Sequence, residues 1–176
     1  MIYMFMKGEK MKRDANVIDE TKILAVLGRN LRTAREMKDL KYADVAHLSG
    51  YDRQCLSQLE YGEQNVRYSS VMKLAKTLDV SFPTLFSRAF KVLPVREGAS
   101  IPGYQEDDYL ALFRTNFRRV LQKNNERQKN ICARSGIPEA SISRILRGDN
   151  NNPQVTTLYA MAESVHMELA DLFKRS

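Results

Sequence analysis

The sequence is poor in cysteine and histidine, with two of each among 176 residues. The cysteines, Cys55 and Cys132, lie far apart in the chain and have no metal-ligand partners near them. This scarcity argues against a zinc site or a disulfide scaffold, and it fits a reducing compartment. We therefore expect a cytoplasmic protein without a metal site, in which Cys132 is a small core residue.

Patterns that carry catalysis or membrane insertion are also missing. The sequence has no Gly-rich phosphate loop, no clustered pair of carboxylates in a cleft-like context and no Ser/His/Asp or Cys/His spacing. The apolar opening MIYMFM is too short to span a membrane, and its charges follow the apolar residues, the reverse of a secretory signal. We expect no enzyme activity, no cofactor, no small-molecule substrate and no membrane partner.

Positive charge is what the sequence has in excess. The formal net charge is +7 and the sequence pI is about 9.5. Residues 21–88 hold 11 Lys/Arg against 7 Asp/Glu, and residues 107–176 hold 11 against 8. A basic balance of this kind favours a nucleic-acid partner.

The stretch Leu40–Gly62 has the pattern of two short helices joined by a tight turn. Gly50 suits a left-handed turn residue, and Asp52 is predicted to cap the second helix. Residues predicted to face inward are Val45, Ala46, Leu48, Leu56 and Leu59. The outer face of the second helix carries Arg53, Gln54, Ser57 and Gln58. Arg and Gln pair with guanine and adenine edges, so the stretch predicts a helix-turn-helix that reads DNA.

The same pattern returns between Gln128 and Gly148. Gly50 and Gly136 are 86 residues apart, as are Gly62 and Gly148. Beyond the second glycine the spacing becomes 87, because one residue is added in the polar loop that follows. A single insertion confined to a loop is what a duplicated fold tolerates.

The repeat predicts an all-α chain with two domains of five helices each. We expect a tail at 1–20, a first domain at 21–88, a linker at 89–106 and a second domain at 107–176. Outside the central pairs, helices are predicted over about 22–37, 69–78, 81–86, 107–123, 156–165 and 168–174. Two alternatives stay open: the tail is mobile or reaches into a DNA groove, and an apolar run at 90–95 forms a short strand or a contact between subunits.

Each repeat resembles the helix-turn-helix domain of the lambdoid phage repressors and Cro proteins, the class called xenobiotic-response-element type. The shared features are the glycine turn, the helix after it, the endings Leu-Glu-Tyr-Gly and Leu-Arg-Gly, and a final Leu-Phe pair. The match covers Leu27–Phe86 and Phe113–Phe173. The resemblance implies two tandem lambda-repressor-like domains joined by an irregular linker.

In that family the second helix of the central pair enters the major groove, and the first directs its N-terminus at a phosphate. The resemblance therefore implies DNA contacts in repeat one by Tyr42, Arg53, Gln54, Ser57 and Gln58. In repeat two it implies contacts by Gln128, Glu139, Ala140, Ser141 and Arg144, while Arg147 and Asn151 suit contacts to the DNA backbone. A solvated surface is the alternative for Arg53, Gln54 and Gln58. Because Glu139 and Ala140 have weak base-reading chemistry, repeat two reads DNA with little preference or serves mainly in assembly.

One paired difference between the repeats supports the alignment. In phage repressors an arginine late in the first helix forms a partly buried ion pair with the Glu of the Leu-Glu-x-Gly ending. The corresponding residues in repeat one are Arg35 and Glu60, and repeat two has Leu121 and Leu146 at those positions. Both members of the pair differ together, as expected if a lone buried charge is costly.

Together these features predict a sequence-specific, double-stranded-DNA-binding regulator of transcription of phage, mobile-element or bacterial type, associated with the nucleoid. The alternatives are a protein-interaction module that kept the fold and a DNA-processing accessory protein. Two domains on one chain could occupy two major-groove segments as a covalent pseudo-dimer. They could instead form a homodimer through the linker or the C-terminal helices and reach four half-sites.

Overall fold

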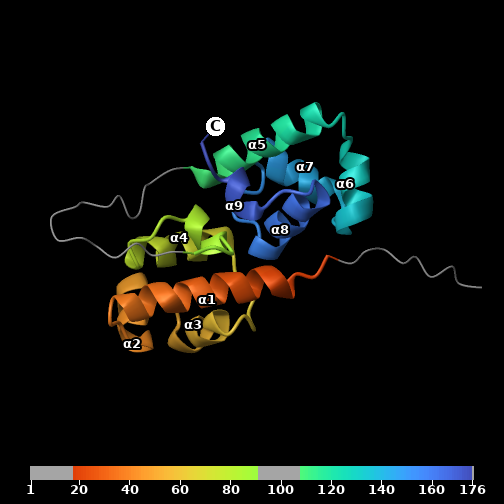
Figure 1. Ribbon diagram of the computed structural model, residues 1–176. Helices are drawn as coiled ribbons and strands as arrows, with labels where there is room; N and C mark the ends of the chain where they lie inside the picture. Colours follow the sequence, from red (N-terminus) through yellow and green to blue (C-terminus); the bar gives the residue numbers. More distant parts are fainter. Residues whose placement is uncertain (1–17, 91–107, 176) are drawn as a thin grey trace, which may run out of the picture.

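Helices form both described parts of the chain, residues 18–90 and 108–175, in the computed structural model (Figure 1). The first part contains α1 (Thr21–Met37), α2 (Tyr42–Ser49), α3 (Arg53–Glu60), α4 (Tyr68–Thr77) and a 3₁₀ turn, η1 (Pro83–Phe86). The second part contains α5 (Tyr109–Lys123), α6 (Gln128–Ser135), α7 (Glu139–Arg147), α8 (Val155–Ser164) and α9 (Leu169–Leu172). These two parts hold no strand beyond one isolated β-bridge, so the predicted all-α fold is confirmed.

The backbone of the second part follows that of the first at its unusual positions. Eight described residues have a positive φ, and they form four pairs at the spacing of the sequence repeat: Asp39 with Asn125, Gly50 with Gly136, Gly62 with Gly148, and Asp79 with His166. Left-handed backbone is uncommon for residues other than glycine. Its recurrence at matching places means that the ends of corresponding helices are built alike.

Side-chain contacts recur in the same way. Asn30 donates hydrogen bonds to two main-chain carbonyls at the end of η1, and Asn116 donates to two at the end of α9. Arg32 and Arg118 each donate to the carbonyl of the corresponding residue at the end of α3 or α7. Each long first helix is therefore tied in the same manner to the central pair and to the last turn of its own part.

The two parts differ in how closely the first helix approaches the third. A Cβ on Gly28 of α1 would lie 2.4 Å from the carbonyl oxygen of Leu59, so only glycine fits between α1 and α3. Arg114 occupies the corresponding position of α5, and its Nε donates to the carbonyl of Ile145 at 2.8 Å. An arginine side chain thus fills the space in the second part that direct backbone contact fills in the first.

The helix predicted over about 22–37 is confirmed as α1, and its apolar residues Ile23, Leu24, Leu27, Leu31 and Ala34 are all buried. The prediction for Leu48 of α2 is wrong, because its side chain is 62% exposed. Three residues make slightly less than one helical turn, which rotates Leu48 about 60° from the buried Val45. On a helix as short as α2, that rotation moves the side chain past the edge of the core.

The two parts pack against each other through an aromatic cluster that the sequence analysis did not predict. Phe82, which is fully buried, has its ring centroid 5.0–5.2 Å from those of Tyr68 and Phe86 in the first part and of Tyr109 and Phe173 in the second. Helix α9 packs on η1, and α8 contacts α1. One continuous apolar core therefore runs through both parts.

Several predictions about the tail and linker concern residues outside the two described ranges. They include the groove-binding arm in residues 1–17 and the short strand expected around Val92, Leu93 and Val95. Phe90, the first apolar residue of that run, is described, and it packs partly buried against the core.

Candidate nucleic-acid interface

Helices α2 and α3 are joined by a turn at Gly50, whose φ of 64° is left-handed. The N–H of Tyr51 donates to Ser49 Oγ at 3.1 Å, and the N–H of Cys55 donates to the Asp52 carboxylate at 2.8 Å. The second bond caps α3 and holds the pKa of Asp52 below its ordinary value. The predicted turn and cap are both confirmed.

The outer face of α3 is polar and open. Leu56 and Leu59 point into the core, whereas the side chains of Arg53, Gln54 and Gln58 are exposed and form no hydrogen bond or ion pair with another described residue. Donors and acceptors left free on a convex helix are available to a ligand. This face has the chemistry that base edges require.

Tyr42 lies at the start of α2 but turns its side chain toward the protein. The Arg35 guanidinium sits 4.3 Å from the centroid of its ring, and its hydroxyl lies close to Glu60 and Ser57. Burial is the main reason that the pKa of Tyr42 is raised, and the Glu60 carboxylate adds to it. The hydroxyl that was expected to meet a phosphate is therefore largely engaged within the domain.

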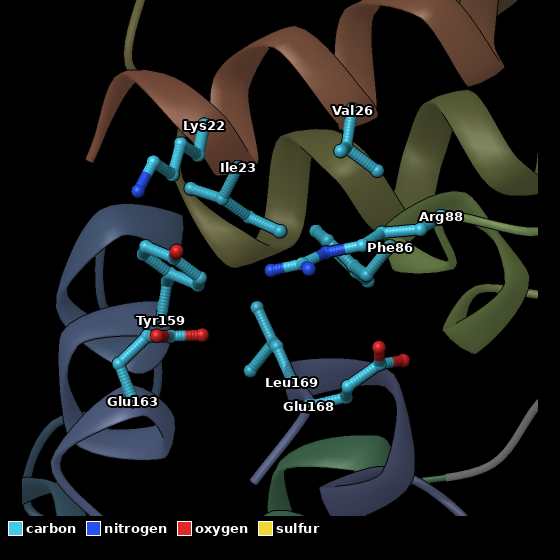
Figure 2. Close-up of a pocket in the computed structure, with 9 residues that line it drawn as sticks. All are labelled: Lys22, Ile23, Val26, Phe86, Arg88, Tyr159, Glu163, Glu168 and Leu169. Atoms are coloured by element: carbon cyan, nitrogen blue, oxygen red, sulfur yellow. The ribbon is translucent and has the colours of Figure 1, made fainter. Parts of the chain in front are cut away.

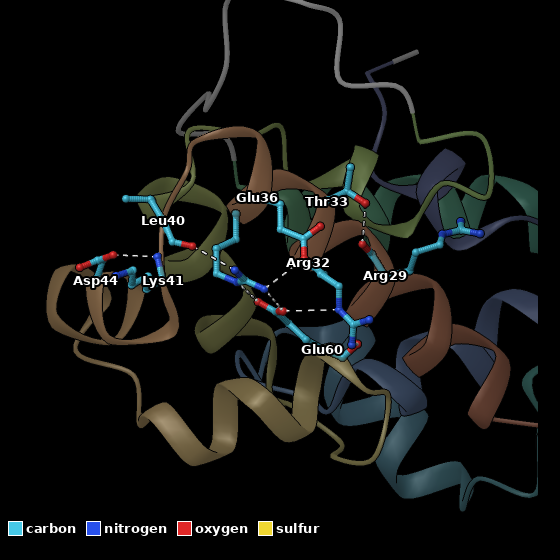
Figure 3. Close-up of polar contacts among 9 residues, drawn as sticks. Arg29, Arg32, Thr33, Glu36, Leu40, Lys41, Asp44 and Glu60 are labelled. Atoms are coloured by element: carbon cyan, nitrogen blue, oxygen red, sulfur yellow. Dashed lines mark hydrogen bonds and ion pairs between the residues drawn. The ribbon is translucent and has the colours of Figure 1, made fainter.

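The predicted ion pair between Arg35 and Glu60 is confirmed. Arg35 Nε and Nη2 donate to the two carboxylate oxygens of Glu60 at 2.7 and 2.8 Å, and Arg32 approaches the same carboxylate at 3.7 Å. Figure 3 shows Glu60 at the end of α3 pointing toward α1, with Arg32 beside it. The hydrogen bonds to Glu60 also raise the pKa of Arg35. A bidentate pair fixes direction as well as distance, so it holds α3 at a set angle to α1.

In the second part, α6 and α7 are joined by the corresponding left-handed turn at Gly136. Pro138 stands where Asp52 stands in the first part, and α7 has no side-chain cap. Glu139, Ala140 and Arg144 are exposed at the start of α7 and one turn on. Their positions correspond to those of Arg53, Gln54 and Gln58.

Surface hollows bring together several of the predicted contact residues of the second part. Ser141, Arg144 and Asn151 line one hollow with residues of the loop after α7. Gln128 and Arg147 line another, between α5, α7 and the start of α6. Gln128 accepts a hydrogen bond from Ser143 Oγ at 3.0 Å, Arg147 pairs with Asp149, and Asn151 accepts from Arg114. Gln128, Arg147 and Asn151 therefore have partners within the second part, unlike Arg53, Gln54 and Gln58 on α3.

Ser141 was predicted to contact DNA, whereas Ser143 was not. By the repeat spacing, Ser143 corresponds to Ser57, and its bond to Gln128 repeats the contact between Ser57 and Tyr42. The role of Arg114 was not predicted either. Arg114 orders the loop after α7 by donating to the side chain of Asn151 and the carbonyl of Asn150. Strict use of the 86-residue spacing identifies Ser143. Arg114 has no such signal, because its counterpart is Gly28.

Leu121 and Leu146, which replace the ion pair in the second part, are both buried and line the same hollow as Gln128. A guanidinium at only one of these positions would have no carboxylate among the residues that line this hollow. The arrangement agrees with the paired exchange deduced from the sequence.

The described ranges contain no group of three or more His, Cys, Asp or Glu residues that could hold a metal ion. Over the same ranges, no helix combines the length and the apolar character needed to cross a bilayer.

Comparison with known proteins links this geometry to a family. The helix-turn-helix family model matches residues 31–85. Control protein C.SmaI of Serratia marcescens is 35% identical over 66 residues, which are 38% of this chain and 79% of that protein. A hypothetical transcription factor of Neisseria meningitidis serogroup B is 33% identical over 76 residues, 43% of this chain and 72% of that protein. Putative protein P2 of Acyrthosiphon pisum secondary endosymbiont phage 1 is 46% identical over 43 residues, 24% and 45% of the two chains. No solved structure matches the chain.

Proposed function

This chain belongs to the helix-turn-helix family of DNA-binding transcriptional regulators of phage and bacterial type, and from that premise we propose that it recognises double-stranded DNA by sequence through α3. The observation that carries the proposal is the open outer face of α3. Arg53, Gln54 and Gln58 are exposed there and have no partner among the described residues of the chain. Arginine binds guanine O6 and N7, and glutamine binds adenine N6 and N7.

The rest of the first part holds α3 rigidly for this task. Two leucines anchor its inner face, Asp52 caps its start, and Glu60 at its end is locked to Arg35. A reading helix with fixed ends loses little conformational freedom on binding. The free side chains can then determine which base pairs are preferred.

We assign a second, different DNA contact to α7 of the second part. Its exposed Glu139, Ala140 and Arg144 occupy the positions that correspond to the open face of α3. A carboxylate can accept from cytosine N4, an alanine methyl can touch the thymine methyl, and Arg144 can bind guanine or phosphate. We therefore treat the second part as a second copy of the domain with its own base preference.

Phosphate contacts supply the sequence-independent share of affinity. The excess of Lys and Arg over Asp and Glu lies in the segments that carry the two parts. Neutralising DNA phosphates releases counterions, so the affinity for any duplex is expected to fall steeply as salt rises. We accordingly propose that the protein acts at the nucleoid, in the cytoplasm.

Selection of bound duplexes from a random pool, followed by footprinting of the winner, tests the proposal. A gel-shift series then compares the selected duplex with a scrambled one at equal salt. We expect a preference of at least about 1,000-fold, the lower end for specific regulators. Equal binding to both duplexes, or none to either, contradicts DNA reading. Those outcomes favour a protein-interaction role, to which the weak base-reading chemistry of Glu139 and Ala140 is also suited.

A further inference from the structure

We propose that one chain, without a second copy, binds an operator made of two unlike half-sites in inverted orientation. This inference rests on the proposed DNA-binding function and adds the number of chains, the orientation of the half-sites and their inequality. It depends on the contact between the two parts. Replacing each residue by its counterpart in the other part turns one contact of this interface into another.

The first such contact is a pair of main-chain hydrogen bonds. Tyr68 N–H donates to the carbonyl of Pro153 at 2.9 Å, and Val155 N–H donates to the carbonyl of Val66, also at 2.9 Å. By the 87-residue spacing, Val155 corresponds to Tyr68, and Pro153 corresponds to Val66. Exchanging the two parts therefore turns each bond into the other, which is the signature of a two-fold contact.

Residues at the centre of this contact pair with their own counterparts. Arg67 and Gln154, which are 87 residues apart, form an isolated antiparallel bridge. Phe86 and Phe173 are also 87 residues apart, and their ring centroids are 5.5 Å from each other. In a two-fold arrangement, only residues beside the axis can touch their own counterparts. These two self-pairs mark the line of a pseudo-two-fold axis between the parts.

The neighbouring contacts follow the same rule with altered side chains. Phe82 stacks on Tyr109, with centroids 5.1 Å apart. Their counterparts are Leu169 and Ile23, which both line the small hollow between α1, α8 and α9 shown in Figure 2. The aromatic pair on one side of the axis is thus replaced by an aliphatic pair on the other.

The axis sets the orientation of the two reading helices. A half-turn relates α3 to α7, so the two helices lie at the same height along the axis, and the components of their directions perpendicular to the axis run in opposite senses. Figure 1 shows α2 and α3 on one side of the central contact and α6 and α7 on the other. Direct repeats in DNA would instead require a translation. The half-turn therefore predicts inverted half-sites, and successive major-groove segments on one face of DNA are centred about 34 Å apart.

The same contact makes a second chain unnecessary. The face of each part that lies on the axis is covered by the other part, through the shared aromatic cluster and the main-chain bonds. Homodimers bring two reading helices together with two chains, whereas this chain carries both. The C-terminal helices, one of the two surfaces expected to form a homodimer, include α9, which packs on η1 of its own chain.

The half-sites must differ because the reading residues differ. Arg53, Gln54 and Gln58 on α3 correspond to Glu139, Ala140 and Arg144 on α7. At the first two of these positions, the Arg and Gln of α3 favour contacts to guanine and adenine. The Glu and Ala of α7 favour contacts to cytosine and thymine. A chain with two unlike readers binds a non-palindromic site in a single orientation.

The test uses the full chain and the duplex selected from a random pool. Native mass spectrometry should find one chain per duplex, and footprinting should show two protected half-sites on one face of the DNA. Inserting about five base pairs between the half-sites moves one to the opposite face and should weaken binding on the order of 100-fold. Inserting about ten restores the face but moves the half-sites about 34 Å further apart, beyond the reach of one rigid chain, and should weaken binding as much as five does. Reversing one half-site to make a direct repeat should weaken binding as much as the five-base-pair insertion.

Paired variants assign each half-site to its helix. Gln58→Ala should relax base preference in one half-site only, and Arg144→Ala should relax preference or weaken contact in the other half-site only. Two chains per duplex, equal affinity for direct and inverted repeats, or both variants acting on the same half-site would overturn the inference while leaving DNA recognition intact. A pool that yields no preferred duplex would instead contradict the proposed function itself.

Discussion

At the scale of single residues, the Arg35–Glu60 pair decides whether α3 stays on α1. The Glu60 side chain is 1% exposed and that of Arg35 is 10% exposed, so removing one partner leaves the other charge buried. We expect Glu60→Leu alone to lower the free energy of unfolding by about 3–5 kcal/mol. Adding Arg35→Leu should recover most of that loss, as the natural Leu121 and Leu146 indicate, and urea denaturation of both variants measures it.

Recovery will be incomplete, because Arg35 also donates to the carbonyl of Leu40 and lies over the ring of Tyr42. Asp171→Asn, which breaks the exposed pair with Lys174, is the matched control and should change stability little. A double variant no more stable than Glu60→Leu would show that the pair does not act as a unit.

Arg53 and Gln58 test the assignment of bases to α3. Both side chains are exposed and free of internal partners, so truncating them should leave stability nearly unchanged. Arg53→Ala or Gln58→Ala should cost about 1–3 kcal/mol of discrimination at one base pair of the selected duplex. Gel shifts on duplexes changed one position at a time measure this. Equal weakening on every duplex would assign the residue to phosphate contact.

At the scale of elements, the start of α3 links its stability to pH. The hydrogen bond from Cys55 N–H lowers the pKa of Asp52 in the folded state below its ordinary value of 3.8. A lowered pKa adds stability above the ordinary value, and that stability is lost as pH falls through the folded value. Wild type should exceed Asp52→Asn in stability at pH 6, and the difference should shrink below pH 3.8.

Comparing the two proteins by urea unfolding at each pH cancels the other acidic groups. Asp19 and Glu126 also have lowered pKa values and titrate in both. Asn keeps an oxygen acceptor for Cys55 but carries no charge to favour the helix N-terminus. A difference that stays constant from pH 6 to pH 3 would show that the charge of the cap contributes nothing. Pro138, at the corresponding position of α7, has no titratable side chain.

Local sequence signals predicted the elements well and their surroundings less well. The glycine turns, the Asp52 cap and the buried face of α1 could be predicted, because backbone geometry and helical period depend on residues that are close together in the sequence. Leu48 was misplaced because a period alone does not fix where the edge of the core lies. The engagement of Tyr42 with Glu60 was missed because it depends on a residue from another helix.

At the scale of the whole molecule, the repeat could be found in the sequence but its packing could not. Phe82, Tyr109 and Phe173 look like ordinary core residues when each repeat is considered alone. Only the structure shows that they fill the space between the parts. Contacts between segments far apart in a chain leave no periodic signal. The sequence therefore left open both a pseudo-dimer and a homodimer.

A shared core also predicts how the chain unfolds. Rings from both parts surround Phe82, so neither part can open without exposing the other's apolar surface. Leu27 in α1 of the first part and Phe117 in α5 of the second part are both fully buried. Leu27→Ala should cost about 2–5 kcal/mol and Phe117→Ala about 3–5 kcal/mol.

Hydrogen exchange locates those losses. If the parts form one cooperative unit, each variant should lower the protection of the slowest amides in α1 and in α8 by the same free energy, since both exchange only through global unfolding. Leu48→Ala, at an exposed site, should change neither by more than about 0.5 kcal/mol. Loss confined to the part that carries the substitution would mean two independently folding bodies. The half-turn between α3 and α7 would then be a weak preference rather than a rigid frame, and an operator would tolerate changes in half-site spacing.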